Sequence, residues 1–125
     1  MKLNNKSILT AKEEEVMTFF WKNGELFVRE IVDMYNPPKP HFNTISTIVR
    51  GLEEKEFVSH KSFGNTYKYF ACVTEEEIGK KSLKSVVGKY FDDSILSAVS
   101  ALIKEDEISI NELKELINLV EKGGK

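Results

Sequence analysis

Residues 37–73 constrain the fold most, because a helical pattern runs directly into a hairpin pattern there. Between residues 41 and 55, apolar residues recur at the three- and four-residue steps of one helix face, and they are Phe42, Ile45, Ile48, Val49 and Leu52. Residues 57–73 form two runs rich in β-branched and aromatic residues around Gly64-Asn65, two residue types that tolerate the positive φ of a tight turn. The sequence therefore predicts a helix over about 41–55 and a β-hairpin over 57–73.

The other face of the predicted helix carries short polar groups and one arginine. Such groups can donate or accept hydrogen bonds at base edges and phosphates, and the major groove of DNA, about 12 Å wide, admits a helix of this kind. A polar helix followed by a hairpin is the order of the recognition helix and wing in winged-helix domains that bind double-stranded DNA. The candidate DNA-binding residues are Lys39, His41, Asn43, Thr44, Ser46, Thr47, Arg50, Lys61, Asn65 and Lys68.

A second interpretation of the same residues stays open. Serine and threonine also occur at solvated helix positions, and a hairpin can be purely structural. On this interpretation the helix and hairpin form a protein–protein interaction module, and DNA binding is incidental or nonspecific. Replacing Asn43 or Arg50 by alanine separates the two, because loss of a base contact relaxes sequence preference at one position of the DNA site.

The segment before this helix supplies the other elements of such a domain. Thr10 and Glu13 form a capping box that opens a first helix, which we expect to end before Gly24. Leu26-Phe27 could form a short strand, and an apolar pattern then predicts a second helix that must stop before Pro37-Pro38. Two helices and a turn thus lead into the polar helix.

The C-terminal part, residues 74–125, predicts three further helices. Thr74 precedes three glutamates and opens a helix that we expect to run to about Asp92; a second covers about 95–103, and Ser109 begins a third with a capping box. About 50 residues without a sheet are marginal as an independent domain, so packing against a second copy is expected, with folding back onto the chain's own first domain as the alternative. The candidate dimerisation residues are Val86, Val87, Tyr90, Phe91, Leu96, Val99, Leu102, Ile103, Leu113, Leu116, Ile117 and Val120.

The fold class expected is therefore α+β and mostly helical, with an N-terminal winged helix-turn-helix domain over 1–73 and a C-terminal helical dimerisation region over 74–125. Several short motifs also occur in an order that is known from one family. They are Leu9-Thr10-Ala11-Lys12-Glu13, Trp21, Glu30-Ile31, the run from Asn43 to Arg50, Tyr67-Lys68-Tyr69, and Ser109 to Leu116. By these motifs the chain resembles the penicillinase repressor and methicillin-resistance repressor family of bacterial winged-helix transcription regulators.

The resemblance implies a homodimeric transcriptional repressor that binds an inverted-repeat operator through two winged-helix domains. It also implies a possible regulatory protease or membrane sensor as a partner, because family members can be inactivated by cleavage at an Asn-Phe pair in the C-terminal helices. The aligned position in this chain is Ala101-Leu102.

The sequence departs from the family pattern at several positions. Glu56 stands where members commonly have glycine after the recognition helix, and Asn65 stands where they have a basic residue beside the wing glycine. Phe27 replaces a threonine that could cap the second helix, so we expect water or backbone to satisfy its first amides. Gly51 lies inside the recognition helix, which we explain by close packing against a neighbouring element.

Charge supports DNA binding only weakly. Residues 1–73 contain ten Lys and Arg against nine Asp and Glu, while residues 74–125 contain eight against eleven. DNA-binding proteins usually present a basic face, so modest nonspecific affinity is expected. Lys2 and Lys6 are further candidate cations.

Other classes of function lack a motif. With two histidines, one cysteine and no glycine-rich phosphate loop, the sequence indicates no metal site, no nucleotide cofactor and no catalytic residue, so we do not expect an enzyme. Cys72 is expected to be a packed core residue rather than a redox sensor. The sequence has no apolar stretch long enough to insert into a membrane and no secretion signal at its start, which favours the cytoplasm.

Overall fold

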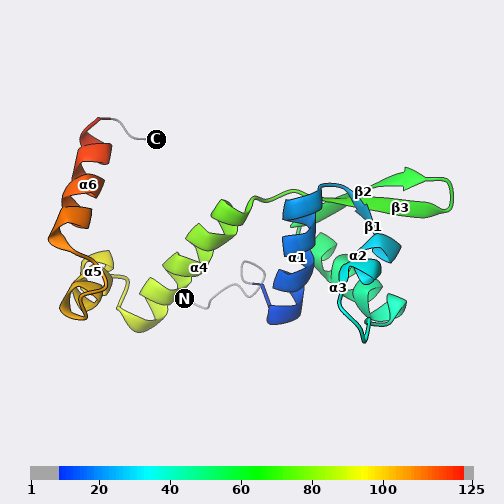
Figure 1. The fold of residues 1–125 in the computed structure, drawn as a ribbon, viewed down its shortest axis with the longest axis horizontal. Coiled ribbons are helices and arrows are strands. Elements are labelled where there is room, and N and C mark those ends of the chain that lie inside the picture. Colours follow the sequence, from blue (N-terminus) through cyan, green and yellow to red (C-terminus); the bar gives the residue numbers. More distant parts are fainter. Residues whose placement is uncertain (1–8, 123–125) are drawn as a thin grey trace. The chain divides into compact units, whose positions relative to one another are not determined.

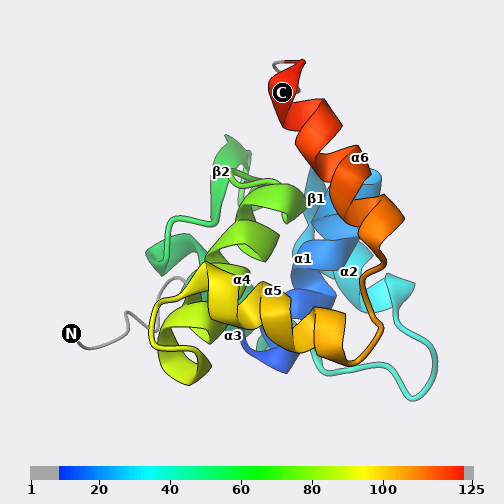
Figure 2. The same cartoon turned by 90° about the vertical axis from the view of Figure 1, so that its left-hand side faces the viewer.

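The structure is a computed structural model and describes residues 9–122. Lys2 and Lys6 lie outside this range. The chain divides into two compact units, one ending at Ser82 and the other beginning at Leu83, and each is treated by itself. The elements, shown in Figures 1 and 2, are α1 (Ala11–Asn23), β1 (Leu26–Phe27), α2 (Val28–Met34), α3 (Phe42–Glu54), β2 (Val58–Phe63), β3 (Thr66–Ala71), α4 (Glu75–Tyr90), α5 (Ile95–Lys104) and α6 (Ile110–Glu121).

The ends of α1 follow the predicted capping signals. Thr10 Oγ1 accepts a hydrogen bond from the Glu13 N–H at 3.2 Å, and Glu13 Oε1 accepts one from the Thr10 N–H at 2.9 Å. Gly24 follows the helix at φ +80°, a conformation that side chains with a Cβ rarely adopt, and its N–H donates to the Phe20 carbonyl. Local chemistry therefore fixes both ends of this helix.

The three strands form one antiparallel sheet in the order β1-β3-β2. The hairpin turns at Gly64-Asn65 as predicted, and Gly64 has φ +58°, which is the requirement of a turn with its first central residue in the left-handed region. Register pairs Val58 with Ala71 and Lys61 with Lys68, so these two pairs lie on opposite faces of the sheet.

The core of the N-terminal unit lies between helices α1 to α3 and one face of this sheet. Its fully buried side chains include Met17 from α1, Ile31 from α2, Ile45 and Leu52 from α3 and Val58 from β2. The winged-helix architecture predicted for this part of the chain is therefore confirmed, with the fold mostly helical and carrying one small sheet.

Cys72 corrects one expectation. Tyr69, Ala71 and Val73 are at least partly buried toward the core, and the alternation of an extended chain points the intervening Cys72 outward, where it is exposed. The prediction of a packed cysteine was wrong because the core-facing positions of this segment are Tyr69, Ala71 and Val73, and Cys72 lies between two of them.

The start of α2 shows a contact that was not expected, and the middle of α3 corrects one more expectation. Glu30 Oε1 accepts the Phe27 N–H at 2.8 Å, so a side chain satisfies this amide although Phe27 itself cannot cap. At Gly51, an added Cβ would meet only Glu13 Oε2, at 4.0 Å. Close packing therefore does not require a glycine at position 51.

The end of α3 has the two hydrogen bonds of a Schellman motif. The Glu56 N–H donates to the Glu53 carbonyl and the Phe57 N–H to the Leu52 carbonyl, each at 2.9 Å. Glu56 occupies the position that normally takes glycine and has φ +68°. The departure from the family pattern at Glu56 thus places a side chain in a strained backbone conformation.

The first turns of α4 belong with the N-terminal unit. Ile78 is buried in its core, and the Trp21 indole N–H donates to the Val73 carbonyl at 2.9 Å, which holds the segment between β3 and α4. Thr74 and Glu77 exchange the two hydrogen bonds of a capping box at the helix start. The helix start at Thr74 is therefore as predicted, and the helix ends at Tyr90.

The second unit presents mostly exposed apolar side chains. No side chain of α5 or α6 is buried in the part of the chain that the structure describes. Of the candidate dimerisation residues, Val87 alone is buried within the chain, Phe91, Val99 and Leu113 are half-buried, and the others are exposed: Val86, Tyr90, Leu96, Leu102, Ile103, Leu116, Ile117 and Val120. Val87 is therefore occupied by intrachain packing.

Candidate nucleic-acid interface

Helix α3 buries one face and leaves the other open, as its residue spacing predicted. Ile45, Val49 and Leu52 pack into the core, whereas Asn43, Thr44, Thr47 and Arg50 are exposed and Ser46 is half-exposed. His41 precedes the helix and caps it, because its Nδ1 accepts the Asn43 N–H at 3.0 Å. This fixes the tautomer, so Nε2 of a neutral His41 is a donor at the helix start.

The Arg50 side chain lies along the exposed face of α3. One of its terminal nitrogens is 3.0 Å from Ser46 Oγ and the other is 3.4 Å from Thr47 Oγ1. These contacts run back along the helix by one turn and hold the guanidinium beside two other candidate residues. A guanidinium in this position offers its remaining N–H groups to a base edge or to a phosphate.

An open groove separates α3 from the hairpin. Its lining comes from the starts of α2 and α3, from the exposed face of α3 and from the hairpin, and consists of Phe27, Val28, Arg29, Glu30, Phe42, Ser46, Arg50, Asn65, Thr66, Tyr67 and Tyr69. The chain contains two arginines, Arg29 and Arg50, and both line this groove. Sequence reasoning missed Arg29, although the scarcity of arginine could have drawn attention to it.

The two hairpin lysines project from the sheet face opposite the helices. Lys61 Nζ forms an ion pair with Glu25 Oε2 at 2.7 Å and lies 5.6 Å from the centre of the Phe70 ring. The hydrogen bond from Lys61 lowers the pKa of the Glu25 carboxyl. Lys68 Nζ lies 5.2 Å from the centre of the Phe27 ring. Lys61 therefore has a charge partner of its own, while Lys68 is held over an aromatic surface.

Lys39 also has intrachain partners. Its Nζ donates to the carbonyl oxygens of Asp33 and Tyr35, each at 2.7 Å, at the end of α2. A cation at the C-terminal end of a helix stabilises the last carbonyls and the helix dipole. The structure thus gives Lys39 a capping role.

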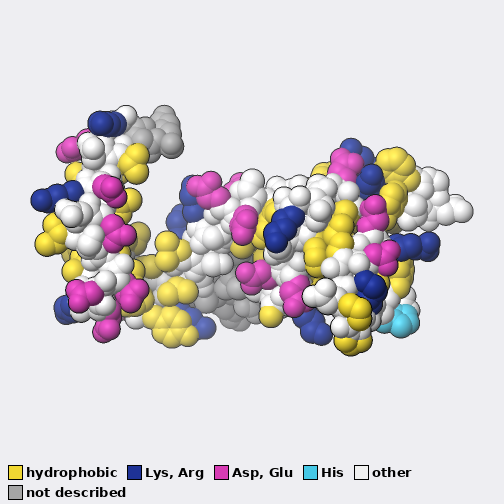
Figure 3. All heavy atoms as spheres, viewed as in Figure 1, with side chains coloured by type: hydrophobic (Ala, Val, Ile, Leu, Met, Phe, Trp, Pro, Cys, Tyr) yellow, Lys and Arg dark blue, Asp and Glu magenta, His cyan; other side chains and the backbone are white. Residues whose placement is uncertain are grey.

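Positive charge is not segregated on the face that Figure 3 shows. Lys and Arg side chains alternate there with Asp and Glu, as the nearly balanced composition of the N-terminal part indicated. Within residues 9–122, no three His, Cys, Asp or Glu side chains gather in a way that could hold a metal ion. No helix among those described is long and apolar enough to cross a membrane.

Comparison with known proteins gives a consistent result. Over 122 residues the chain is 25% identical to the methicillin resistance regulatory protein MecI of Staphylococcus aureus strain N315, covering 96% of this chain and 99% of the relative. It is 26% identical over 123 residues to the penicillinase repressor of Staphylococcus aureus, and the match covers 94% of this chain and 98% of that protein. It is 22% identical over 115 residues to the penicillinase repressor of Bacillus licheniformis, and the match covers 91% of this chain and 90% of that protein. Residues 9–122 match the family model described as penicillinase repressor, and the chain belongs to this family.

Proposed function

We propose that this chain is a homodimeric transcriptional repressor that binds an inverted-repeat operator, with α3 in the major groove and the β2–β3 hairpin near the DNA backbone. The observation that carries this proposal is the groove between α3 and the hairpin, because both arginines of the chain line it. Two of the relatives are named penicillinase repressor and a third is named a methicillin resistance regulatory protein, and membership of the penicillinase repressor family favours a repressor over an enzyme.

Base reading is assigned to the exposed face of α3. Asn43 and Arg50 are the residues there whose side chains can make two hydrogen bonds to one base, and Thr44, Ser46 and Thr47 supply single donors and acceptors. Arg29 and Lys68 are proposed to contact phosphates, together with Asn65 at the hairpin turn and His41 at the helix start. Lys61 can contact a phosphate only after it gives up its ion pair with Glu25, so we expect it to contribute less to DNA affinity.

Dimerisation is assigned to the C-terminal region, in which we include residues 74–125. Helices α5 and α6 expose Leu96, Leu102, Leu116, Ile117 and Val120, and monomeric proteins rarely leave so many large apolar side chains of neighbouring helices in water. A second copy of the same helices is a self-complementary partner for this surface.

Regulation by a protease or membrane sensor fits the same arrangement. The position aligned with the family cleavage site, Ala101-Leu102, lies inside α5, and Leu102 is exposed. Cleavage there would detach α6 and with it much of the apolar surface. Truncation after Ile103 is therefore expected to weaken operator binding, because two linked half-sites gain far more than one.

The test is binding of purified protein to DNA from upstream of its own gene, measured by fluorescence anisotropy at ~150 mM salt beside a scrambled duplex. A preference of about a thousandfold with two chains per site supports the proposal. Arg50→Ala should then cost roughly 1 to 3 kcal/mol and relax preference at one base pair, whereas Arg29→Ala should weaken all sequences alike. Equal weak binding to both duplexes, followed by failure to select any site from random DNA, would instead favour the protein–protein interaction module.

A further inference from the structure

Glu53 on α3 and His60 on β2 form a side-chain contact that joins the helix to the hairpin. His60 Nδ1 lies 2.6 Å from Glu53 Oε2. Because a carboxylate only accepts, the Nδ1 atom carries the hydrogen in this contact. The two side chains are 32% and 30% exposed, so water screens the contact less than it screens the Lys61–Glu25 pair, with 55% and 42% exposed.

The His60 ring continues this contact to the groove wall. It stacks on the Tyr67 ring with 4.1 Å between centroids and meets the edge of the Tyr69 ring at 5.6 Å. Tyr67 is 47% exposed and lines the groove that Arg50 also lines. Burial, and after it the Glu53 carboxylate, raise the pKa of Tyr69. A series of contacts thus runs from Glu53 through His60 to the exposed Tyr67.

The outer half of the hairpin needs such support. The β1 strand pairs with Tyr69 and Lys68, so in the part of the chain that the structure describes residues 62–67 have no third strand beside them. Figure 1 shows the hairpin extending beyond the helices of its own unit. A two-stranded ribbon is marginally stable by itself in water, so side-chain contacts decide where it lies. His60 lies in the three-stranded part, paired with Tyr69, and its stacking on Tyr67 extends the Glu53–His60 contact to the first residue pair of the two-stranded part.

We propose that Glu53 and His60 are positioning residues that hold the wing against α3, keep the groove between them open to one DNA strand, and turn Tyr67 toward it. This inference rests on the proposed function, since it concerns how the same interface is preorganised. Neither residue touches DNA in this proposal. Their contribution to affinity comes from avoiding the loss of conformational freedom that a mobile wing would suffer on binding.

Electrostatics alone predicts the opposite effect of removing Glu53. A carboxylate beside a polyanion opposes binding, so its loss should strengthen binding to any DNA. The positioning role predicts weaker binding to the operator. Glu53→Gln removes the same charge but keeps an oxygen that can accept from His60. Glu54→Ala removes a carboxylate from the next residue, which is exposed and forms no ion pair among residues 9–122.

The experiment compares Glu53→Ala, Glu53→Gln, His60→Ala and Glu54→Ala in the full chain, using operator anisotropy and hydroxyl-radical footprinting. Thermal unfolding of each variant identifies any that fail to fold. We expect Glu53→Ala and His60→Ala to lose roughly three- to tenfold in operator affinity and to lose protection where the wing lies, while protection by α3 remains. Glu53→Gln should stay within about twofold of the wild type, and Glu54→Ala should bind no more weakly than it.

Two results would overturn the inference. One is operator binding by Glu53→Ala as tight as that of Glu54→Ala; the other is a folded Glu53→Gln variant that binds as weakly as Glu53→Ala. Failure of the proposed function gives a different result, because the wild-type chain itself would then bind operator and scrambled duplexes alike.

Discussion

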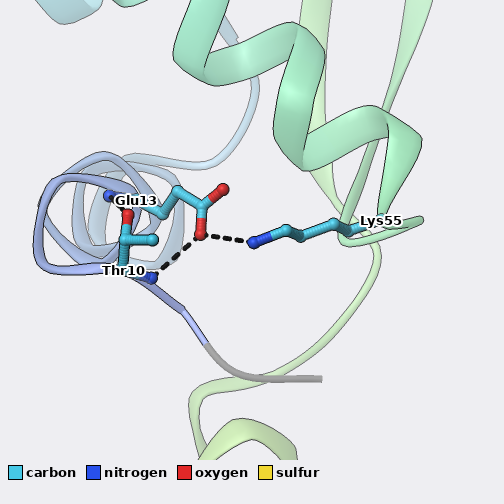
Figure 4. Close-up of polar contacts among 3 residues, drawn as sticks. All are labelled: Thr10, Glu13 and Lys55. Atoms are coloured by element: carbon cyan, nitrogen blue, oxygen red, sulfur yellow. Dashed lines mark hydrogen bonds and ion pairs between the residues drawn. The ribbon is translucent and has the colours of Figure 1, made fainter. Parts of the chain in front are cut away.

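Replacing Glu13 by Gln is expected to destabilise the N-terminal unit by about 1.5 kcal/mol at neutral pH. Figure 4 shows the reason: Glu13 Oε1 accepts hydrogen bonds from the Thr10 N–H at 2.9 Å and from Lys55 Nζ at 2.7 Å. The contact joins the start of α1 to the end of α3. The side chains of Lys55 and Glu13 are only 20% and 12% exposed, so water screens their attraction weakly.

The magnitude follows from what Gln keeps and what it loses. A Gln oxygen can still accept from the Thr10 N–H, so that half of the capping box survives. The contact with Lys55 changes from a bond between two charged groups to a bond between an ammonium and a neutral amide oxygen. Because hydrogen bonds to charged groups contribute roughly 1.5 to 3 kcal/mol and neutral ones about 1, we expect part of that difference to be lost. Lys55 would in addition be left without a counter-charge, and this loss brings the expected destabilisation to about 1.5 kcal/mol.

The penalty should depend on pH. Burial raises the pKa of Glu13, but hydrogen bonds from Lys55 and Thr10 together outweigh it and hold the pKa below its usual 4.5. A carboxyl whose pKa is lower in the folded state contributes stability that is complete above the unfolded-state pKa and is lost as the pH falls through the folded-state pKa. The difference between the wild type and Glu13→Gln should therefore be largest at neutral pH and shrink below pH 4.5.

Urea unfolding at fixed protein concentration measures this difference, because association couples to stability. Fluorescence of Trp21, the single tryptophan, reports on the same unit. Glu14→Gln is the matched control, since Glu14 is exposed in the same first turn and shares only the helix-dipole contribution. Equal penalties for Glu13→Gln and Glu14→Gln, or additive effects of Glu13→Gln and Lys55→Met, would refute the reasoning.

Two further substitutions test backbone conformation within α3 and just after its end by the same urea assay. Glu56→Gly should stabilise the unit by roughly 0.5 kcal/mol, because relief of the strain at φ +68° exceeds the flexibility that glycine adds to the unfolded chain, and a loss of stability would contradict this. Gly51→Ala should stabilise it by up to about 1 kcal/mol with operator affinity unchanged, since the new Cβ meets only Glu13 Oε2 at 4.0 Å; destabilisation would show that the site is more crowded than the structure indicates.

The fold could be predicted from the sequence wherever local chemistry decides it. Four helix ends are marked in this way. The hydroxyl oxygens of Thr10, Thr74 and Ser109 accept hydrogen bonds from backbone N–H groups at helix starts, and Gly24 adopts the positive φ that ends α1. Each of these interactions spans at most four residues. The hairpin turn at Gly64 is equally local. Cys72 shows where such reasoning ends, since its direction depends on which strand face meets the helices.

The contacts of charged side chains were less predictable, because their partners are distant in sequence. Lys61 meets Glu25 from 36 residues away, and Lys55 meets Glu13 from 42. Arg29 reaches the groove only because α2 begins beside the hairpin. Patterns within one element indicated that α3 has an exposed polar face, but they could not show which cations are already paired.

This pairing also explains why net charge says little about the interface. In the N-terminal unit, Lys55 and Lys61 form ion pairs with Glu13 and Glu25, and Lys39 binds the end of α2, so these cations serve the fold first. Both arginines, in contrast, line the groove, and within residues 9–122 the Arg50 guanidinium is bonded to the hydroxyl groups of Ser46 and Thr47, which carry no charge to balance it. A DNA-binding interface of this kind would gain little affinity from long-range attraction between a positively charged protein surface and DNA. For the homodimeric repressor that we propose, specificity would depend instead on hydrogen-bond geometry along α3 and on the simultaneous occupation of two half-sites, and therefore on a few residues of α3 and on the exposed apolar side chains of α5 and α6.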